Sequence, residues 1–271
     1  MRILPRDFLV VNDMYFAVVT KIGKGYIVSA RFDKNHKTRQ YPRRFYRYVD
    51  ALKKKALWIK KNELNRHISA RRYEKYEISD IALEIVDRIR EGVALRKKNI
   101  GITGSYLLGF ENENSDIDIV AYGTKAYIKI VKNLFEIEGI ERLRERDWIK
   151  VYMKRCVRYP FRTFLFHERR KKNRGILGGH MFDILPVTKV YRISQVQERS
   201  FFEFKGNVLE DRHRICYPAK YNIEGFEVFS YDFNFLDQVR EGEKAYVKGE
   251  LEVTKDKNRV YVGEEGYLGL I

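Results

Sequence analysis

The sequence predicts an α+β fold, in which a core with a short mixed sheet and helices on one side is flanked by β-rich modules at both ends. Both ends carry short runs rich in Val, Ile, Tyr and Phe, separated by turn signals, which are typical of strands. The middle shows apolar residues at helical spacing around two short apolar runs. We therefore expect an N-terminal basic module at 1–75, the core at 76–195 and an all-β module at 196–271.

Composition indicates a protein with a large core and a polyanionic partner. The chain has 271 residues, 44% of them hydrophobic, and a formal net charge of +17. Its two cysteines are far apart, so neither a disulfide framework nor a zinc site is indicated. No apolar stretch is long enough to cross a bilayer, so we expect a cytoplasmic protein with no membrane partner.

The positive charge is concentrated in the first 200 residues. Residues 201–271 carry a net charge of −4, so residues 1–200 carry +21. A first basic block spans 34–75, with fifteen Lys and Arg against three acids. Its interleaved aromatic residues are Tyr41, Phe45, Tyr46, Tyr48, Trp58 and Tyr73. This mixture suits single-stranded RNA, whereas the alternative is a set of core aromatics beneath a solvated face of cations.

Two helices are expected in the core. The first covers 79–97, with Ser79 as N-cap. Its apolar stripe is formed by Ile81, Ala82, Ile85, Val86 and Ile89. The second covers 124–138, and we expect its inward face to contain Ile128, Val131 and Phe135.

The segment Ile100–Gly123, which reads IGITGSYLLGFENENSDIDIVAYG, carries the residues best suited to chemistry. Asp116 and Asp118 lie in a strand-like run, where residues i and i+2 point to one face. Two adjacent carboxylates repel each other unless a cation lies between them or one keeps its proton. Mg²⁺ prefers carboxylate and phosphate oxygens, and Gly104-Ser105 after the preceding apolar run allows close approach of backbone N–H groups to a phosphate.

This segment resembles the polymerase-β-type nucleotidyltransferases in its pattern of a Gly-Ser pair, ten further residues and an Asp-x-Asp motif. This superfamily includes poly(A) polymerases, CCA-adding enzymes and antibiotic nucleotidyltransferases. The resemblance covers roughly residues 78–190. Thr103 departs from the apolar residue usual before the glycine. Together with the later segment HERRKKNRG, the pattern is similar to an archaeal family of predicted nucleotidyltransferases.

The resemblance implies a third carboxylate on a later strand, and the candidate is Asp183 in the run Met181–Val187. An Asp buried alone in such a strand would be costly, but it becomes sensible if it faces the same metal ions. By resemblance, Asp183 would hold a second metal or accept the proton of the attacking hydroxyl. The catalytic and metal-binding candidates are thus Asp116, Asp118 and Asp183, with Mg²⁺ or Mn²⁺ as cofactor.

A second basic block spans 140–174, with thirteen Lys and Arg against four acids. Its end lies shortly before the strand of Asp183, so Arg169, Arg170 and Lys172 are candidates, with Gly104 and Ser105, for contacts to the nucleotide phosphates. The alternative is a solvated loop. If RNA is a partner, we expect it to contact 34–75 and 140–174.

These features predict an Mg²⁺-dependent enzyme that transfers a nucleoside monophosphate from an NTP to a hydroxyl acceptor, either RNA or another polyanion, with release of pyrophosphate. Two alternatives stay open. One is a non-catalytic RNA-binding protein with a relict transferase core, and the other is an antitoxin-like enzyme that modifies protein side chains. The acidic C-terminal module is expected to be OB-like or barrel-like, and its charge argues against a role in oligonucleotide binding.

Overall fold

A computed structural model describes residues 2–33, 35, 45–52, 54–155, 157, 159–188, 195–263 and 265–271. The chain packs as two compact units. Residues 1–69 and 187–271 form the first unit, and residues 70–186 form the second. The expected α+β class, with β-rich regions on both sides of the core, is confirmed. The three-module boundaries predicted above stay a prediction.

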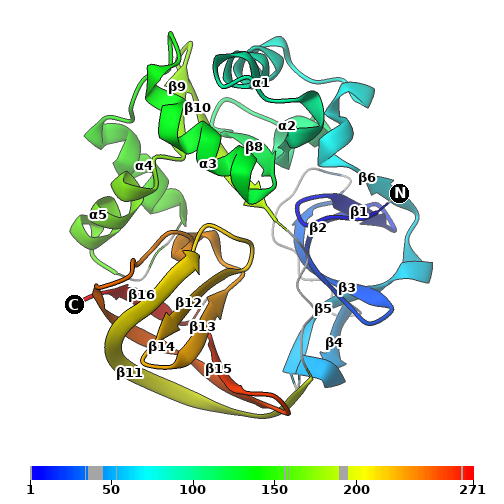
Figure 1. Ribbon diagram of the computed structural model, residues 1–271. Helices are drawn as coiled ribbons and strands as arrows, with labels where there is room; N and C mark the ends of the chain where they lie inside the picture. Colours follow the sequence, from blue (N-terminus) through cyan, green and yellow to red (C-terminus); the bar gives the residue numbers. More distant parts are fainter. Residues whose placement is uncertain are drawn as a thin grey trace. The chain divides into compact units, whose positions relative to one another are not determined.

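The N-terminal part of the first unit is a six-stranded sheet in the order β4-β5-β3-β2-β1-β6 (Figure 1). The strands are β1 (Phe8–Val11), β2 (Met14–Ile22), β3 (Gly25–Phe32), β4 (Tyr46–Val49), β5 (Lys54–Lys60) and β6 (Arg66–Ile68). Its core holds Phe16 and Phe45, whose rings meet edge to face at 5.4 Å. Of the aromatics in the first basic block, Phe45 and Tyr73 are buried and Tyr46 and Tyr48 are exposed, while Tyr41 lies outside the described residues.

The C-terminal part of the first unit is a β-barrel. Its strands are β11 (Val196–His213), β12 (Ala219–Ile223), β13 (Phe226–Ser230), β14 (Lys244–Thr254), β15 (Asn258–Tyr261) and β16 (Tyr267–Leu270). The long strand β11 pairs with β12 through its C-terminal part and with β14 through its N-terminal part. This double pairing closes the ring β11-β12-β13-β15-β14, because each of these strands then has two neighbours.

The second unit contains a four-stranded sheet in the order β7-β8-β10-β9. Its strands are β7 (Ile100–Thr103), β8 (Ile117–Tyr122), β9 (Arg174–Leu177) and β10 (His180–Val187). Its helices are α1 (Asp80–Gly92), α2 (Gly104–Leu108), α3 (Thr124–Asn133), α4 (Glu145–Arg155) and α5 (Phe161–Lys171). Helices α1, α2 and α3 pack against β7 or β8 (Figure 1). Gly104 and Ser105 begin α2 directly after β7, and Asp118 on β8 pairs with Thr103, the last residue of β7.

Both core helices differ in detail from the predictions. The first ends at Gly92 rather than at 97, and Ala94 follows with a φ of 45°. The second ends at Asn133 and continues as a short 3₁₀ turn. Its buried face contains Tyr127, Ile130 and Leu134. The i, i+3, i+7 spacing was therefore right, but the stripe lies one residue earlier, because the aromatic Tyr127 and not Ile128 faces the sheet.

Candidate active site

Neighbouring strands bring the predicted carboxylates together. Asp118 lies on β8, Asp183 lies on β10 beside it, and Asp116 directly precedes β8. The pKa of Asp183 is raised well above its ordinary value, first because the side chain is buried and also because the carboxylates of Asp118 and Asp116 repel its charge, while Arg155 acts in the opposite direction. Two carboxylates that are close in sequence and one that is 65 residues further along therefore share one electrostatic environment.

Gly104 packs against this carboxylate group. Its φ of 73° lies in the left-handed region, which favours glycine. A Cβ atom at this position would lie less than 3.0 Å from Oδ2 of Asp118, so any other residue would displace that carboxylate. Ser105 follows in the first turn of α2 and is half-buried. The requirement for glycine therefore comes from the approach of Asp118 as well as from the turn.

A lysine already contacts Asp116. The Nζ atom of Lys154, at the end of α4, lies 2.9 Å from Oδ2 of Asp116 and 3.3 Å from the carbonyl oxygen of Asn114. The Lys154 side chain is 55% exposed, so it can leave at little cost in free energy. Asp116 is thus the member of the group whose charge is partly balanced by a mobile cation.

Asp183 also contacts a buried ion-pair network that sequence reasoning missed. Its Oδ2 atom lies 2.8 Å from Arg174 on β9 and 3.4 Å from Arg155 on α4. Both guanidinium groups also contact Glu168, at 3.3 Å and 3.2 Å. Lys171 donates a further hydrogen bond to Glu168.

Glu168 remains ionised at the centre of this network. Burial alone would raise its pKa, but the nearby cations, Lys171 and Arg155 foremost, outweigh that effect and lower it. The sequence held one signal of this role: Glu168 and Lys171 are three residues apart on a helix, where side chains of opposite charge meet. The convergence of Arg155 and Arg174 had no such signal, because it depends on how α4 and β9 pack.

The predicted phosphate-contacting cations lie at the end of α5. Arg169 and Lys172 are exposed, and Lys172 ends the helix with a φ of 51°. Arg170 is half-buried, with its guanidinium 5.3 Å from the centroid of the Phe166 ring. The cations found on the carboxylates are instead Lys154, Arg155 and Arg174. The role of Arg169, Arg170 and Lys172 stays a prediction.

The donor set fits a hard divalent cation in part. Oδ1 of Asp183 is buried and has no hydrogen-bond partner among the described residues. The carboxylate of Asp118 on the next strand supplies oxygens of the kind that Mg²⁺ prefers. In the described part of the chain, however, no three His, Cys, Asp or Glu side chains are placed to hold one ion together. A metal would thus meet two carboxylates directly, and Asp116 only after Lys154 moves.

Comparison with known proteins identifies the central region. Residues 79–177 match the family model described as the nucleotidyltransferase domain. This part of the chain is therefore similar to nucleotidyltransferase domains. The matched region includes Gly104, Ser105, Asp116 and Asp118 but ends before Asp183. The place of Asp183 in the site therefore rests on the sheet order and on its electrostatic contact with the other two carboxylates.

One relative comes from an archaeon. The chain is 33% identical over 197 residues to the uncharacterized protein MJ1086 of Methanocaldococcus jannaschii. The alignment covers 65% of this chain and 58% of that protein, so the chain spans less than two thirds of the relative it matches. No solved structure matches. Among the described helices, none has the length and apolar character needed to span a membrane.

Proposed function

We propose that the protein is a metal-dependent nucleotidyltransferase that moves a nucleoside monophosphate from an NTP to a hydroxyl acceptor and releases pyrophosphate. The nucleotidyltransferase domain supports nucleotidyl transfer in general terms. The observation that carries the finer proposal is the position of Asp118 and Asp183 on neighbouring strands, beside Gly104. This arrangement would place the carboxylate oxygens of two neighbouring strands next to a triphosphate bound at Gly104.

Each residue has a proposed role. Asp116, Asp118 and Asp183 would hold Mg²⁺ or Mn²⁺. The ions, when bound, would balance the charge that develops on the transferred phosphoryl group. Asp183 would also accept the proton of the attacking hydroxyl, and its Oδ1 atom, which has no hydrogen-bond partner among the described residues, is available for either task. Gly104 and Ser105 would contact the β and γ phosphates, with Arg169, Arg170 and Lys172 as further phosphate contacts.

RNA or another polyanion is the proposed acceptor. A hollow of about 560 Å³ on the N-terminal sheet is lined by Lys21, Lys24, Lys60, Lys61, Gly23, Asn62, Tyr26 and Trp58. Four of these lining residues are lysines, and exposed Tyr46 and Tyr48 lie on β4 of the same sheet. Cations for phosphates and rings for bases are the usual elements of single-strand recognition.

Part of the charge of the second basic block is engaged inside the second unit. Arg155, Lys171 and Arg174 are committed to the buried network around Glu168. The exposed cations of α4 and α5, such as Lys150 and Arg169, are the ones that could contact a strand. Residues 34, 36–44 and 53 of the first block lie outside the described residues.

The decisive experiment is incubation of the protein with each labelled NTP, Mg²⁺ and either total RNA or total protein from cells. We expect label in the RNA, and we expect Asp118→Asn to reduce it at least about a hundredfold without changing the melting temperature. Label in the protein fraction would instead favour the protein-modifying enzyme. A third outcome would favour the relict, non-catalytic core. In it, neither fraction carries label, and the unchanged chain and Asp118→Asn both bind RNA with an affinity that falls steeply as the salt concentration rises.

A further inference from the structure

Helix α5 in the second unit has an inner face that packs on the core and an outer face that meets solvent. On the inner face, Phe164 is fully buried, Leu165 packs against the same cluster, and Glu168 contacts Arg155 and Arg174. Residues three and four apart lie on one side of a helix, so the side chains at 164, 165 and 168 define the inner face.

A large aromatic side chain lies on the outer face. Phe166 is two residues from Phe164 and two from Glu168, and it is 52% exposed. Two residues of helix correspond to a rotation of about 200°, so the ring points away from the core. Single exposed apolar side chains are common on protein surfaces. The exposure of Phe166 therefore gains meaning only from the side chains around it.

The side chains around Phe166 are arginines. Arg162 and Arg169 lie four residues before it and three residues after it, so they share its face of the helix. Both are exposed, and neither has an ion pair among the described residues. The guanidinium of Arg170 lies 5.3 Å from the centroid of the Phe166 ring. The one acidic residue of α5, Glu168, points inward, so α5 itself places only cations beside the ring.

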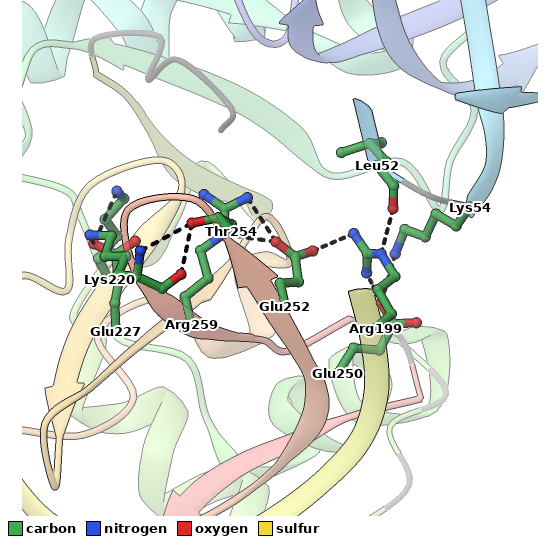
Figure 2. A network of polar contacts seen from close by, with 10 residues as sticks. Leu52, Lys54, Arg199, Lys220, Glu227, Glu250, Glu252, Thr254 and Arg259 are labelled. Carbon is green, nitrogen blue, oxygen red and sulfur yellow. Dashed lines mark hydrogen bonds and ion pairs between the residues drawn. The ribbon is translucent and has the colours of Figure 1, made fainter. Parts of the chain in front are cut away.

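Arginines that serve the fold of this protein contact buried carboxylates. In the first unit, Arg199 on β11 and Arg259 on β15 both contact Glu252 on β14, which is 2% exposed (Figure 2). Among the described residues, Arg162 and Arg169 have no carboxylate of this kind. Their charge is therefore available to an anion from outside the chain.

A second exposed phenylalanine has the opposite surroundings. Phe201 on β11 is 66% exposed, and Nζ of Lys248 lies 5.7 Å from its ring centroid. However, Phe201 is paired across the strands with Glu250, and Glu203 points to the same face of the sheet. A phosphate beside Phe201 would lie near two carboxylates, whereas a phosphate beside Phe166 would lie among arginines. Phe201 thus provides a comparison for exposure without a cationic surround.

We propose that the outer face of α5 binds single-stranded RNA, with an unpaired base stacked on Phe166 and the neighbouring backbone phosphate at Arg162. Aromatic rings that stack on bases, beside cations that contact phosphates, form the usual surface for single strands. Arg169 and Arg170 keep their proposed role toward the nucleotide phosphates. A base held in a duplex cannot stack on a side chain in this way, so the surface selects unpaired RNA.

This surface is separate from the hollow on the N-terminal sheet, whose lining residues belong to the first unit. The proposal rests on the proposed function only in naming RNA as the partner. Binding of RNA to α5 needs neither NTP nor metal. It can therefore be measured with EDTA present, where no transfer takes place.

The test is fluorescence anisotropy of a labelled oligouridylate of about twelve nucleotides, titrated with the full chain. We expect Phe166→Ala to weaken binding at least about fivefold, because the stacked base loses its platform. Phe166→Trp should retain the affinity. The same strand paired with oligoadenylate should bind more weakly, and its affinity should not respond to Phe166→Ala. Unchanged binding of the single strand by Phe166→Ala would overturn the proposal.

Arg162 is tested through the salt dependence of binding. Loss of one phosphate contact to a single strand lowers the slope of log affinity against log salt by about 0.7, so Arg162→Gln should show this decrease and Arg162→Lys should not. Arg96→Gln is the matched control, because Arg96 is an exposed arginine of the same unit with no described ion pair. Equal decreases in Arg162→Gln and Arg96→Gln would show a general effect of net charge and overturn the site.

Two further comparisons separate stacking from charge and from self-association. Inorganic polyphosphate carries charge but no bases, so its affinity should fall in Arg162→Gln and stay unchanged in Phe166→Ala. Phe201→Ala should bind the oligouridylate as the unchanged chain does, since its ring lies beside carboxylates. A loss in Phe201→Ala as large as that in Phe166→Ala would contradict the assignment to α5. A changed oligomeric state of Phe166→Ala in sedimentation would instead assign the ring to an interface between copies.

The outcome is independent of nucleotidyl transfer. Asp118→Asn should bind the oligouridylate as the unchanged chain does, and loss of binding in this variant would place the RNA at the carboxylate group instead. A chain that transfers no label but whose RNA affinity depends on Phe166 would leave this proposal standing while the proposed function fails. A chain that labels RNA but whose RNA affinity does not depend on Phe166 would do the reverse.

Discussion

The two buried ion-pair networks of this protein differ in what they leave unsatisfied. Within the described part of the core, Glu168 contacts three cations, while one oxygen of Asp183 has no hydrogen-bond partner. In the first unit, both oxygens of Glu252 are paired, one with Arg199 and the other with Arg259. The same residue types therefore leave a carboxylate oxygen open to a cation in the core and leave none open on Glu252, because the described partners around each carboxylate differ.

The strongest test of this comparison removes the central charge from each network. Glu168→Gln and Glu252→Gln should each lower the free energy of unfolding by about 3 kcal/mol, because buried cations lose their partner. Only Glu168→Gln should also reduce nucleotide transfer, since Arg155 and Arg174 contact both Glu168 and Asp183. Denaturant unfolding measures the loss of stability, and the labelled-NTP assay measures the loss of transfer. Equal loss of transfer in both variants would contradict the claim that only the Glu168 network supports the carboxylate group.

The pH dependence of the Glu168 pair has a definite sign. The pKa of Glu168 is lowered in the folded protein, so its contribution to stability is present above its ordinary pKa and is lost as pH falls through the lower, folded value. The difference in melting temperature between the unchanged chain and Glu168→Gln should therefore shrink at acid pH. A difference that grows on acidification would be incompatible with an ionised Glu168.

The second test concerns the close approach at Gly104. Gly104→Ala should cost about 2 kcal/mol and most of the transfer activity, because the new Cβ meets Asp118 and the backbone has a positive φ. Gly109→Ala is the matched control, with a φ of 68° and open space around the position. It should cost about 1 kcal/mol and leave transfer intact. Equal activity in the two variants would show that Asp118 need not be held there.

The third test uses the raised pKa of Asp183, which has the opposite sign to that of Glu168. Its ionised form opposes folding, and this penalty appears as pH rises through the raised, folded pKa. Without metal at pH 8, Asp183→Asn should therefore be more stable than the unchanged chain, by about 1 kcal/mol, while losing transfer. Mg²⁺ should raise the melting temperature of the unchanged chain only, and a rise of the same size in the variant would exclude Asp183 as a ligand.

The smallest effect is expected at Lys154. Lys154→Ala should change stability by less than about 1 kcal/mol, because the pair with Asp116 is largely exposed. It should lower the Mg²⁺ concentration needed for half-maximal transfer a few-fold, since the competing cation is gone. Lys150→Ala on the same helix is the control and should leave that concentration unchanged. A rise in the required Mg²⁺ would mean that Lys154 assists nucleotide binding.

By itself, the sequence determined the local elements and the chemical character of the central region. Short-range patterns of spacing and turns predict the β-rich ends, the strand that contains Asp118 and follows Asp116, and the similarity to nucleotidyltransferase domains. Periodicity located helix α3 but missed its phase by one residue, because tertiary packing chose Tyr127 for the buried face.

Tertiary structure alone decided which charges meet. The pairing of Arg155 and Arg174 with Asp183 has no signature in the sequence, where Asp183 stands alone in an apolar run and both arginines belong to the second basic block. Local propensity is a property of neighbouring residues, whereas the partners of a buried charge are set by strand order and helix packing. Those partners determine whether a charge is balanced, and so whether it stabilises the fold or is left to bind a ligand.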